Sequence, residues 1–250
     1  MFSPDDLWRE PTEDTGLNSR EVHVWRSSLD LPASYLDALL QTLAPDEQAR
    51  AARFHFLEDR QHFIAARGIL RAILSRYLGV EPARLRFCYG DHGKPNLVKE
   101  TGGDDLRFNV SHSHALALFA VTQNREVGID VEWVRADIET DKIAGRFFST
   151  LEVEALRGLP PPAQQVAFFN CWTRKEAYIK ARGEGLSMPL DKFDVSLAPG
   201  EPVALLCTRG EPLEAGRWSL RELFPGSGYV AAVAAQGKDW RLKCLQWSKE

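Results

Sequence analysis

The spacing of apolar and polar positions changes along the chain, and each spacing predicts one type of element. Alternation predicts a strand over 21–26, a further strand is predicted over 85–89, and strand-like runs predict strands over 106–111, 116–122 and 127–133. Apolar residues three and four apart predict helices over 32–43, from 45, and over 58–78, 138–147, 151–157 and 162–182. The segment 193–247 alternates through four or five further strands. Gln123–Glu126 joins two strands and is predicted to form a hairpin loop.

The two long helices are followed by similar segments. After each helix come a glycine, a proline and a strand with phenylalanine, namely Gly79, Pro82 and Phe87, and then Gly185, Pro189 and Phe193. This order is common, so the signal is weak by itself. It predicts an α+β chain with a loose leader over 1–20 and two similar α/β halves over 21–123 and 124–250. A site at the junction of the halves is the default expectation.

Composition and charge exclude several classes of protein. The 250 residues include 35 acidic residues against 31 Lys and Arg residues, a net charge of -4, whereas nucleic-acid-binding domains are typically basic. The sequence has neither a membrane-spanning apolar run nor the pattern of a secretion signal. We therefore expect a cytoplasmic protein that binds neither nucleic acid nor membrane. The four cysteines are far apart, which predicts reduced thiols that fill core space.

Two carboxylates interrupt the otherwise apolar strand 127–133. Asp130 and Glu132 are two residues apart, so they project from the same face of the strand. Adjacent carboxylates repel each other, and burying them without a partner is costly. A hard cation such as Mg²⁺ relieves that cost. The alternative is the solvated face of an edge strand, and the D-x-E pattern alone does not decide between them.

The second long helix presents an aromatic residue, an acid and a base on one face. Trp172, Glu176 and Lys180 are spaced four apart. An exposed pair of Glu176 and Lys180 would explain this spacing without any function. The helix ends near Gly183 and Gly185, where a ligand could approach the backbone, and this setting favours a functional role.

The remaining candidates each have a structural alternative. Ser111 and His112 end a strand and either cap backbone amides or contact a phosphate. Lys94 and Pro95 form either a surface turn or a ligand contact. The helical arginines either solubilise the surface or bind phosphate; these are Arg50, Arg53, Arg67 and Arg71. Glu152 lies in an S-x-x-E capping box, which competes with a catalytic role.

Taken in order, these motifs resemble the Sfp-type 4′-phosphopantetheinyl transferases. Between about Arg50 and Leu190 the chain carries G-K-P, F-N-x-S-H-S, V-G-I-D-x-E, R-F-F-S-x-x-E and W-x-x-K-E-A-x-x-K, the last followed by G-x-G-L-x-x-P-L. Their common order and intact internal spacing make the resemblance specific. It implies two α+β halves with pseudo-twofold symmetry and coenzyme A bound in the cleft between them.

The resemblance also implies roles for individual residues. The metal ligands would be Asp130, Glu132 and Glu176, with Glu176 also counted among the catalytic residues. Lys180 matches the lysine near the pyrophosphate, and Glu152 matches a proposed general base, with a metal-bound water as the alternative base. The nucleotide end of coenzyme A would be contacted by Lys94, Pro95, Ser111 and His112. Arg50 and Arg67 match contacts to the 3′-phosphate, but Glu47 and Leu57 replace basic residues that relatives often have, so which basic group holds this phosphate stays open.

The implied activity is the Mg²⁺-dependent transfer of 4′-phosphopantetheine from coenzyme A to a serine of an apo carrier protein, with release of 3′,5′-ADP. The carrier is of fatty-acid, polyketide or nonribosomal-peptide type, and the enzyme is expected to be a monomer. Two alternatives remain. One is a metal-dependent hydrolase that cleaves the phosphodiester or pyrophosphate of such nucleotides. The other is a non-catalytic coenzyme A-binding module, which is less expected because the acidic residues and Lys180 are all present.

Overall fold

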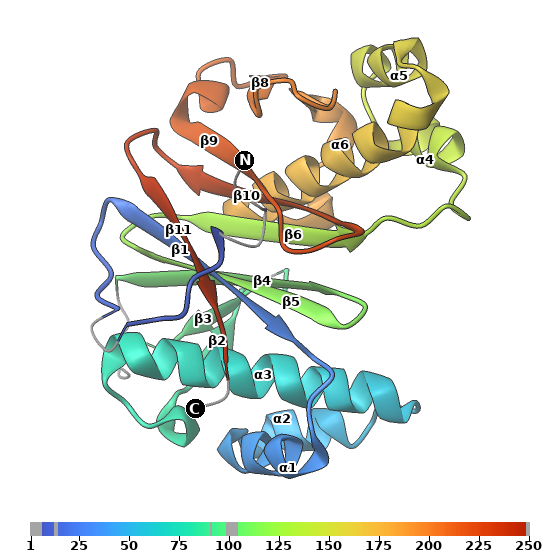
Figure 1. Cartoon of the computed structure of the whole chain (residues 1–250). Helices are drawn as coiled ribbons and strands as arrows, with labels where there is room; N and C mark the ends of the chain where they lie inside the picture. Colours follow the sequence, from blue (N-terminus) through green and yellow to red (C-terminus); the bar gives the residue numbers. More distant parts are fainter. Residues whose placement is uncertain (1–6, 13–14, 91, 99–104, 249–250) are drawn as a thin grey trace.

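The computed structural model describes residues 7–12, 15–90, 92–98 and 105–248. Two sheets lie between two layers of helices, so the order through the molecule is helix, sheet, sheet, helix (Figure 1). Buried apolar clusters fill the two interfaces between sheet and helices and the space between the sheets. The expected mixed α+β chain with a sheet and helices in each half is confirmed.

The first sheet has the strand order β11-β1-β5-β4. Its strands are β1 (Glu21–Ser28), β4 (Leu106–Ser113), β5 (Leu116–Gln123) and β11 (Arg241–Gln246). One face is covered by helices α1 (Ala33–Thr42), α2 (Pro45–Ala51) and α3 (Leu57–Leu78). Ile69 and Ile73 of α3 belong to the same buried cluster as Trp25 of β1 and Phe119 of β5, which explains the helical spacing of the apolar residues in α3.

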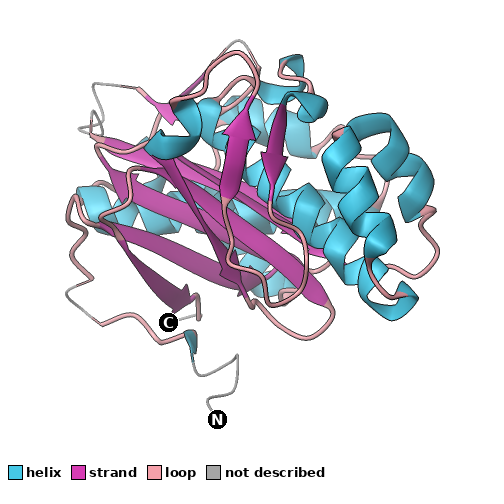
Figure 2. Cartoon of the chain, turned by 90° about the horizontal axis from the view of Figure 1, so that it is seen from above, coloured by secondary structure: helices cyan, strands magenta, loops and turns pink. Residues whose placement is uncertain are grey.

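The second sheet has the strand order β6-β10-β9. Its strands are β6 (Val127–Trp133), β9 (Trp218–Leu223) and β10 (Tyr229–Gln236). Helix α6 (Pro161–Arg182) packs across it, and α4 (Thr140–Phe147) and α5 (Thr150–Gly158) lie beyond the strands at one end (Figure 2). Two short ladders flank the sheets, β2 (Phe87–Tyr89) with β3 (Pro95–Leu97), and β7 (Phe193–Val195) with β8 (Leu205–Thr208).

Strand β5 is apolar at nearly every position because both of its faces are buried. Phe119 and Val121 belong to the cluster under α3, whereas Leu118 and Ala120 belong to the cluster between the two sheets. Ile129 of β6 joins the second cluster from the opposite sheet. The two halves therefore share a continuous apolar interface.

The segment Gln123–Glu126 does not form a hairpin, so this prediction was wrong. Strand β5 pairs with β1 and β4, whereas β6 pairs with β10. The short turn, with Asn124 at a φ of 54°, instead carries the chain from the first sheet to the second. Local alternation identifies two strands but contains no information about which strands they pair with.

Both long helices contain 22 residues and end at a glycine in the left-handed conformation. Gly79 has a φ of 64° and Gly183 has a φ of 74°, a region that glycine enters at little cost. The sequence analysis matched Gly79 with Gly185, but Gly185 instead begins the short 3₁₀ turn Gly185–Ser187. The equivalent helix ends are therefore Gly79 and Gly183.

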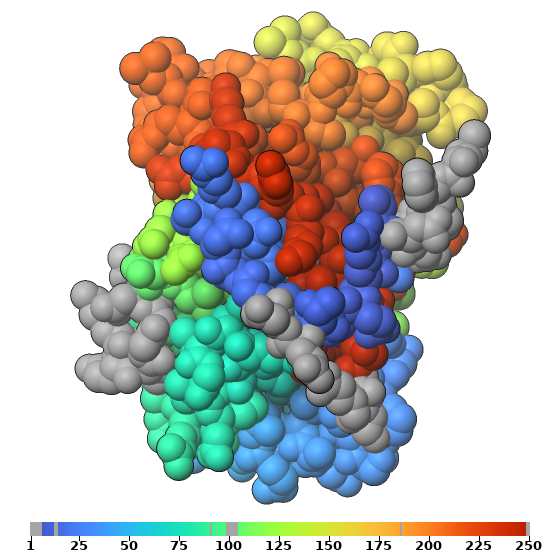
Figure 3. All heavy atoms as spheres, turned by 60° about the vertical axis from the view of Figure 1, so that its left-hand side comes forward, coloured from blue at the N-terminus to red at the C-terminus, as the bar shows by residue number. Residues whose placement is uncertain are grey.

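The two ends of the chain meet on the first sheet. Strand β11 pairs in parallel with β1, although its residues fall within the predicted second half, 124–250. Arg9 forms a parallel bridge with Leu245, and the buried Trp8 donates its Nε1–H to Phe224 O at 2.7 Å. Part of the expected loose leader therefore packs beside β11 (Figure 3). Residues 1–6 and 13–14 of that leader lie outside the described residues.

The four cysteines are free thiols, but they do not all fill core space as expected. Cys171 is buried and Cys244 is partly buried, whereas Cys88 and Cys207 are exposed. In the described part of the chain, no helix combines the length and the apolar composition needed to cross a bilayer.

Candidate active site

The predicted acidic residues come from strand β6 and helix α6, whose backbones pack closely. Gly128 of β6 allows this approach, because a Cβ atom there would lie 2.1 Å from Ala177 O and 2.3 Å from Ala181 N of α6. Asp130 follows two residues later on β6, and Glu176 precedes Ala177 on α6. The glycine of V-G-I-D-x-E therefore sets the spacing between the strand and the helix that contribute the carboxylates.

One pocket of about 400 Å³ contains most of the predicted chemistry. Strand β4 supplies three of its residues, β6 supplies two, and α6 supplies three. The lining residues are Val110, Ser111, His112, Asp130, Glu132, Trp172, Glu176 and Lys180. The structure thus brings the three predicted metal ligands together with Lys180 and two predicted nucleotide contacts.

Two acidic residues of this pocket, Glu132 and Glu176, have raised pKa values. Burial and the neighbouring Asp130 raise the pKa of Glu176 to about 7, against an ordinary value of 4.5, although Lys180 partly offsets the effect. Burial and Asp130 also raise the pKa of Glu132. Both shifts mean that the pocket disfavours a second and a third negative charge, and that a cation would relieve the repulsion.

Asp130 is buried, which excludes the solvated face of an edge strand as its environment. Its Oδ1 accepts hydrogen bonds from Lys180 Nζ at 2.7 Å and from Ser111 Oγ at 2.9 Å. Lys180 thus pairs with Asp130, whereas the simple helical pair would have joined it to Glu176. The other oxygen, Asp130 Oδ2, is buried and has no hydrogen-bond partner among the described residues.

The donor chemistry of the pocket fits a magnesium ion. An unpartnered buried carboxylate oxygen is costly, and oxygen atoms of carboxylates are the ligands that Mg²⁺ prefers. Among the described residues, no three His, Cys, Asp or Glu side chains already stand in a group that could hold a metal. The three carboxylates line a common pocket without forming a ready metal cage, and the ammonium group of Lys180 forms an ion pair with Asp130 in this structure.

Strand β4 is joined to β6 by side chains. Asn109 Oδ1 accepts the backbone N–H of Ile129 at 2.9 Å, and Ser111 Oγ accepts that of Val131 at 3.3 Å. Ser113 Oγ accepts the N–H of Trp133 at 3.1 Å. Each of these side chains contacts the residue 20 positions later in the sequence, so the two strands run in the same direction. We call this row of Asn109, Ser111 and Ser113 the polar seam, and it fixes β6 against the first half of the molecule.

A second pocket of about 770 Å³ adjoins the acidic one, because Val110 and His112 line both. Its wall includes four of the predicted coenzyme A contacts, namely His112, Arg50, Arg67 and Pro95. Arg50 lies over the ring of Phe63, 5.2 Å from its centroid, and forms no ion pair with any described residue. Arg50 is therefore available to an anion, while Glu58 and Asp59 bring negative charge to the same pocket wall.

Arg67 differs from Arg50 because its charge is already paired. Its Nε donates to the buried carboxylate of Glu47, which also pairs with Arg71 at 2.7 Å. The Arg67 guanidinium also donates to Tyr89 Oη at 2.8 Å and lies 4.0 Å from the centroid of the Phe87 ring. One carboxylate thus neutralises part of the charge of two arginines.

Lys94, a predicted nucleotide contact, connects the two halves. Its Nζ donates to Val127 O and Ala181 O, both at 3.2 Å, and to Glu126 Oε2 at 3.3 Å. Burial lowers the pKa of Lys94, and Glu126 acts in the opposite direction. The Lys94 side chain is directed at the end of α6, so in this structure its ammonium group serves the junction between the halves.

Glu152 is enclosed by structural contacts. Its Oε2 accepts the N–H of Ser149 at 2.9 Å, which completes the capping box of α5, and its Oε1 accepts the N–H of Val195 at 2.9 Å. The Lys175 ammonium lies 2.7 Å from Oε2, and both side chains are buried. A general base needs a free oxygen facing the substrate, so these contacts fit the capping-box alternative better than catalysis.

Three residues that contribute to the site were not identified individually from the sequence. Ser113 belongs to the polar seam, Gly128 sets the spacing of β6 and α6, and Lys175 neutralises Glu152. The regular alternation of Asn109, Ser111 and Ser113 was a visible signal. It was incomplete, because the strand that receives these side chains is 20 residues away in the sequence.

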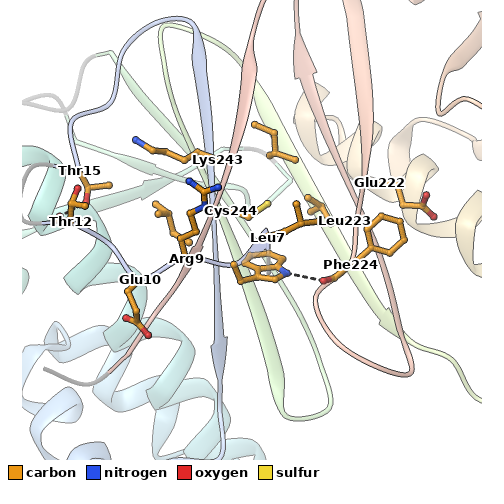
Figure 4. Close-up of a pocket in the computed structure, with 13 residues that line it drawn as sticks. Leu7, Arg9, Glu10, Thr12, Thr15, Glu222, Leu223, Phe224, Lys243 and Cys244 are labelled. Carbon is orange, nitrogen blue, oxygen red and sulfur yellow. Dashed lines mark hydrogen bonds between the residues drawn. The ribbon is translucent and has the colours of Figure 1, made fainter. Parts of the chain in front are cut away.

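Another pocket, of about 540 Å³, lies at the surface where the leader meets β9 and β11 (Figure 4). Arg9, Glu10, Phe224 and Lys243 are among its lining residues. Of the described residues predicted for the site, none lines it. The predicted chemistry is therefore concentrated in the two adjoining pockets around β4, β6 and α6.

An acidic pocket that adjoins a pocket with both arginine and acidic side chains on its wall, built from two α+β halves, fits an enzyme whose substrate carries phosphate groups. Two family models match the chain. Residues 25–124 match "4′-phosphopantetheinyl transferase, N-terminal", and residues 126–234 match the "4′-phosphopantetheinyl transferase superfamily". The boundary between the two matches falls at the turn between β5 and β6.

Similar curated proteins agree with the family models. The 4′-phosphopantetheinyl transferase HetI of Nostoc sp. is 46% identical over 94% of this chain and 96% of its own length. The 4′-phosphopantetheinyl transferase Sfp of Bacillus subtilis is 30% identical over 64% of this chain and 69% of its own length. The chain belongs to the Sfp-type 4′-phosphopantetheinyl transferase family, and it is a 4′-phosphopantetheinyl transferase.

Proposed function

We propose that the chain transfers the 4′-phosphopantetheine group of coenzyme A to a serine of an apo carrier protein. The serine oxygen forms a bond to the phosphorus that carries pantetheine. The bond from that phosphorus to the bridging oxygen breaks, the serine proton passes to a base, and 3′,5′-ADP leaves. The carrier is of fatty-acid, polyketide or nonribosomal-peptide type. The observation that carries this proposal is the grouping of Asp130, Glu132, Glu176 and Lys180 in one pocket.

The acidic pocket would hold the pyrophosphate of coenzyme A, where the transfer takes place. Asp130, Glu132 and Glu176 would bind one Mg²⁺, whose chemistry is to neutralise phosphate charge and to stabilise the charge that develops during transfer. Lys180 pairs with Asp130 Oδ1 in this structure, and its ammonium would turn to the leaving phosphate. Most of the rate enhancement would then come from positioning and electrostatics.

The adjoining pocket would hold the nucleotide end of coenzyme A. Its volume, about 770 Å³, is in the range of sites that enclose ligands of drug size or larger. Arg50 offers an unpaired guanidinium to the 3′-phosphate, and His112 lies between the two pockets. Pro95 lines the same wall. We assign the 3′-phosphate to Arg50 rather than to Arg67, because Glu47 already pairs with Arg67.

The two halves would be related by pseudo-twofold symmetry, with the substrate in the cleft between them. This is supported by the two 22-residue helices with left-handed glycine ends and by a pocket with walls from both halves. Because one chain supplies both walls, we propose that a monomer is the active form. We also propose that it acts in the cytoplasm, as the sequence led us to expect.

One incubation tests the proposed function directly. The chain is mixed with coenzyme A, Mg²⁺ and an apo carrier protein, and the carrier is analysed by intact mass. We expect the carrier to gain one phosphopantetheine group, and to gain none in EDTA. Release of 3′,5′-ADP without a carrier, with no mass gain when a carrier is added, would instead indicate the hydrolase alternative.

Replacing Lys180 with alanine is expected to reduce turnover more than it reduces the affinity for coenzyme A. The ammonium group would stabilise charge that develops only as the leaving group departs, and such interactions lower kcat. A fall in kcat of about 100-fold is expected, since one preorganised charge contributes roughly 3 kcal/mol. Steady-state kinetics with a saturating carrier measures both parameters. A variant with unchanged kcat and raised KM for coenzyme A would make Lys180 a binding residue.

A further inference from the structure

The polar seam repeats the same arrangement at two successive positions. Ser111 Oγ accepts the N–H of Val131 and donates to the carboxylate of Asp130, the preceding residue. Ser113 Oγ accepts the N–H of Trp133 and donates to the carboxylate of Glu132 at 3.2 Å. Each hydroxyl thus binds the backbone of β6 and the adjacent acidic side chain at the same time.

The third member of the seam lacks the second contact. Asn109 Oδ1 accepts the N–H of Ile129, but the preceding residue on β6 is Gly128, which has no side chain. Asn109 therefore contributes to the seam without touching a carboxylate. The chain itself provides a comparison between seam contacts with and without an acidic partner.

We propose that Ser113 is a positioning residue, which holds the Glu132 carboxylate in the orientation that the metal requires, as Ser111 holds Asp130. The inference rests on the proposed function, because it assumes that these carboxylates bind Mg²⁺. It also gives Ser111 a role in addition to its predicted contact with coenzyme A, and it gives Ser113 a first role in the site. A carboxylate restrained by a hydroxyl loses less conformational freedom when it binds an ion.

The hydroxyl of Ser111 is already saturated by its neighbours. It donates to Asp130 and accepts from Val131 N and, at 3.1 Å, from Lys180 Nζ. One hydroxyl can donate one hydrogen bond and accept two. A substitution of Ser111 would therefore disturb Lys180 as well as the acid. Among the described residues, the Ser113 hydroxyl forms hydrogen bonds with Glu132 and Trp133 alone, so Ser113 is the sharper residue to test.

The experiment measures metal binding without turnover. Mn²⁺ is titrated into the full chain with coenzyme A present and no carrier, and electron paramagnetic resonance separates free from bound ion. We expect Ser113→Ala to weaken Mn²⁺ binding about tenfold, the size of effect typical when a residue behind a metal ligand is removed. Ser113→Thr keeps a hydroxyl and is expected to restore the affinity to within about threefold.

Asn109→Ala is the matched control, since it removes a seam contact but no contact to a carboxylate. We expect it to lower the unfolding temperature, as Ser113→Ala does, and to leave Mn²⁺ affinity within about twofold of the original chain. Unchanged affinity in Ser113→Ala, or an equal loss in both alanine variants, would overturn the inference. If the original chain neither binds Mn²⁺ nor modifies a carrier, the proposed function itself fails, so the two failures are distinguishable.

Discussion

Replacing Glu176 with glutamine is expected to lower kcat/KM for carrier modification at least about 100-fold while the fold stays intact. The substitution keeps the shape of the side chain and removes one of three carboxylates that line the acidic pocket. Loss of a metal ligand removes stabilisation of the transition-state charge, and roughly 3 kcal/mol corresponds to about a 100-fold change in rate. The measurement is the initial rate of carrier modification at saturating Mg²⁺.

The same variant is expected to unfold at the same or a higher temperature in EDTA at pH 8. The pKa of Glu176 is raised to about 7 from its ordinary value of 4.5, so ionisation of this group opposes folding. Stability from this group is therefore greatest at low pH, where Glu176 is protonated in both states, and falls as the pH rises from 4.5 toward about 7. Glutamine cannot ionise, so the variant should lose activity without losing stability.

Asp37→Asn provides a control for the removal of a negative charge. Asp37 is exposed on α1, outside both pockets, and its substitution is expected to change the rate by less than about twofold. A near-normal rate for Glu176→Gln at saturating Mg²⁺ would show that Glu176 is not a metal ligand. A clear fall in the unfolding temperature would mean that the lost activity reflects damage to the fold.

The elements of this fold could be predicted locally, but their partners could not. The helical spacing in α3 and α6 and the strand-like runs of β4 and β5 arise from burial of one face or both, and burial is visible in the order of apolar residues. The choice of partner is a long-range event. The pairing of β11 with β1 joins residues about 220 positions apart, and nothing in the alternation of residues 241–246 indicates it.

The same distinction applies to the candidate site. Spacing placed Asp130 with Glu132 and Glu176 with Lys180, and the resemblance joined the two pairs in one pocket. Spacing could not reveal that Lys180 pairs with Asp130, because that contact crosses from helix to strand over 50 positions. The environment of Glu152 was equally hidden, since its capping box is local whereas its contacts with Lys175 and Val195 are not.

Glu152→Ala is expected to lower the free energy of unfolding by about 3–5 kcal/mol, because it leaves a buried ammonium group without its counter-charge. Lys175 is fully buried, and besides Glu152 it donates to Leu190 O at 2.7 Å and to Phe193 O at 2.6 Å. The substitution also removes the acceptor for the N–H groups of Ser149 and Val195. Urea denaturation followed by circular dichroism measures the loss.

Glu152→Gln separates the structural role from catalysis. Glutamine keeps one oxygen that can accept a backbone N–H, and it removes the charge that both a base and a partner of Lys175 need. We expect a smaller loss of stability than with alanine and, at a temperature where the variant is fully folded, a transfer rate within about threefold of the original. A general base contributes about 10²–10⁴-fold. A folded Glu152→Gln variant with a loss of that size would assign proton removal to Glu152 and contradict the structural role.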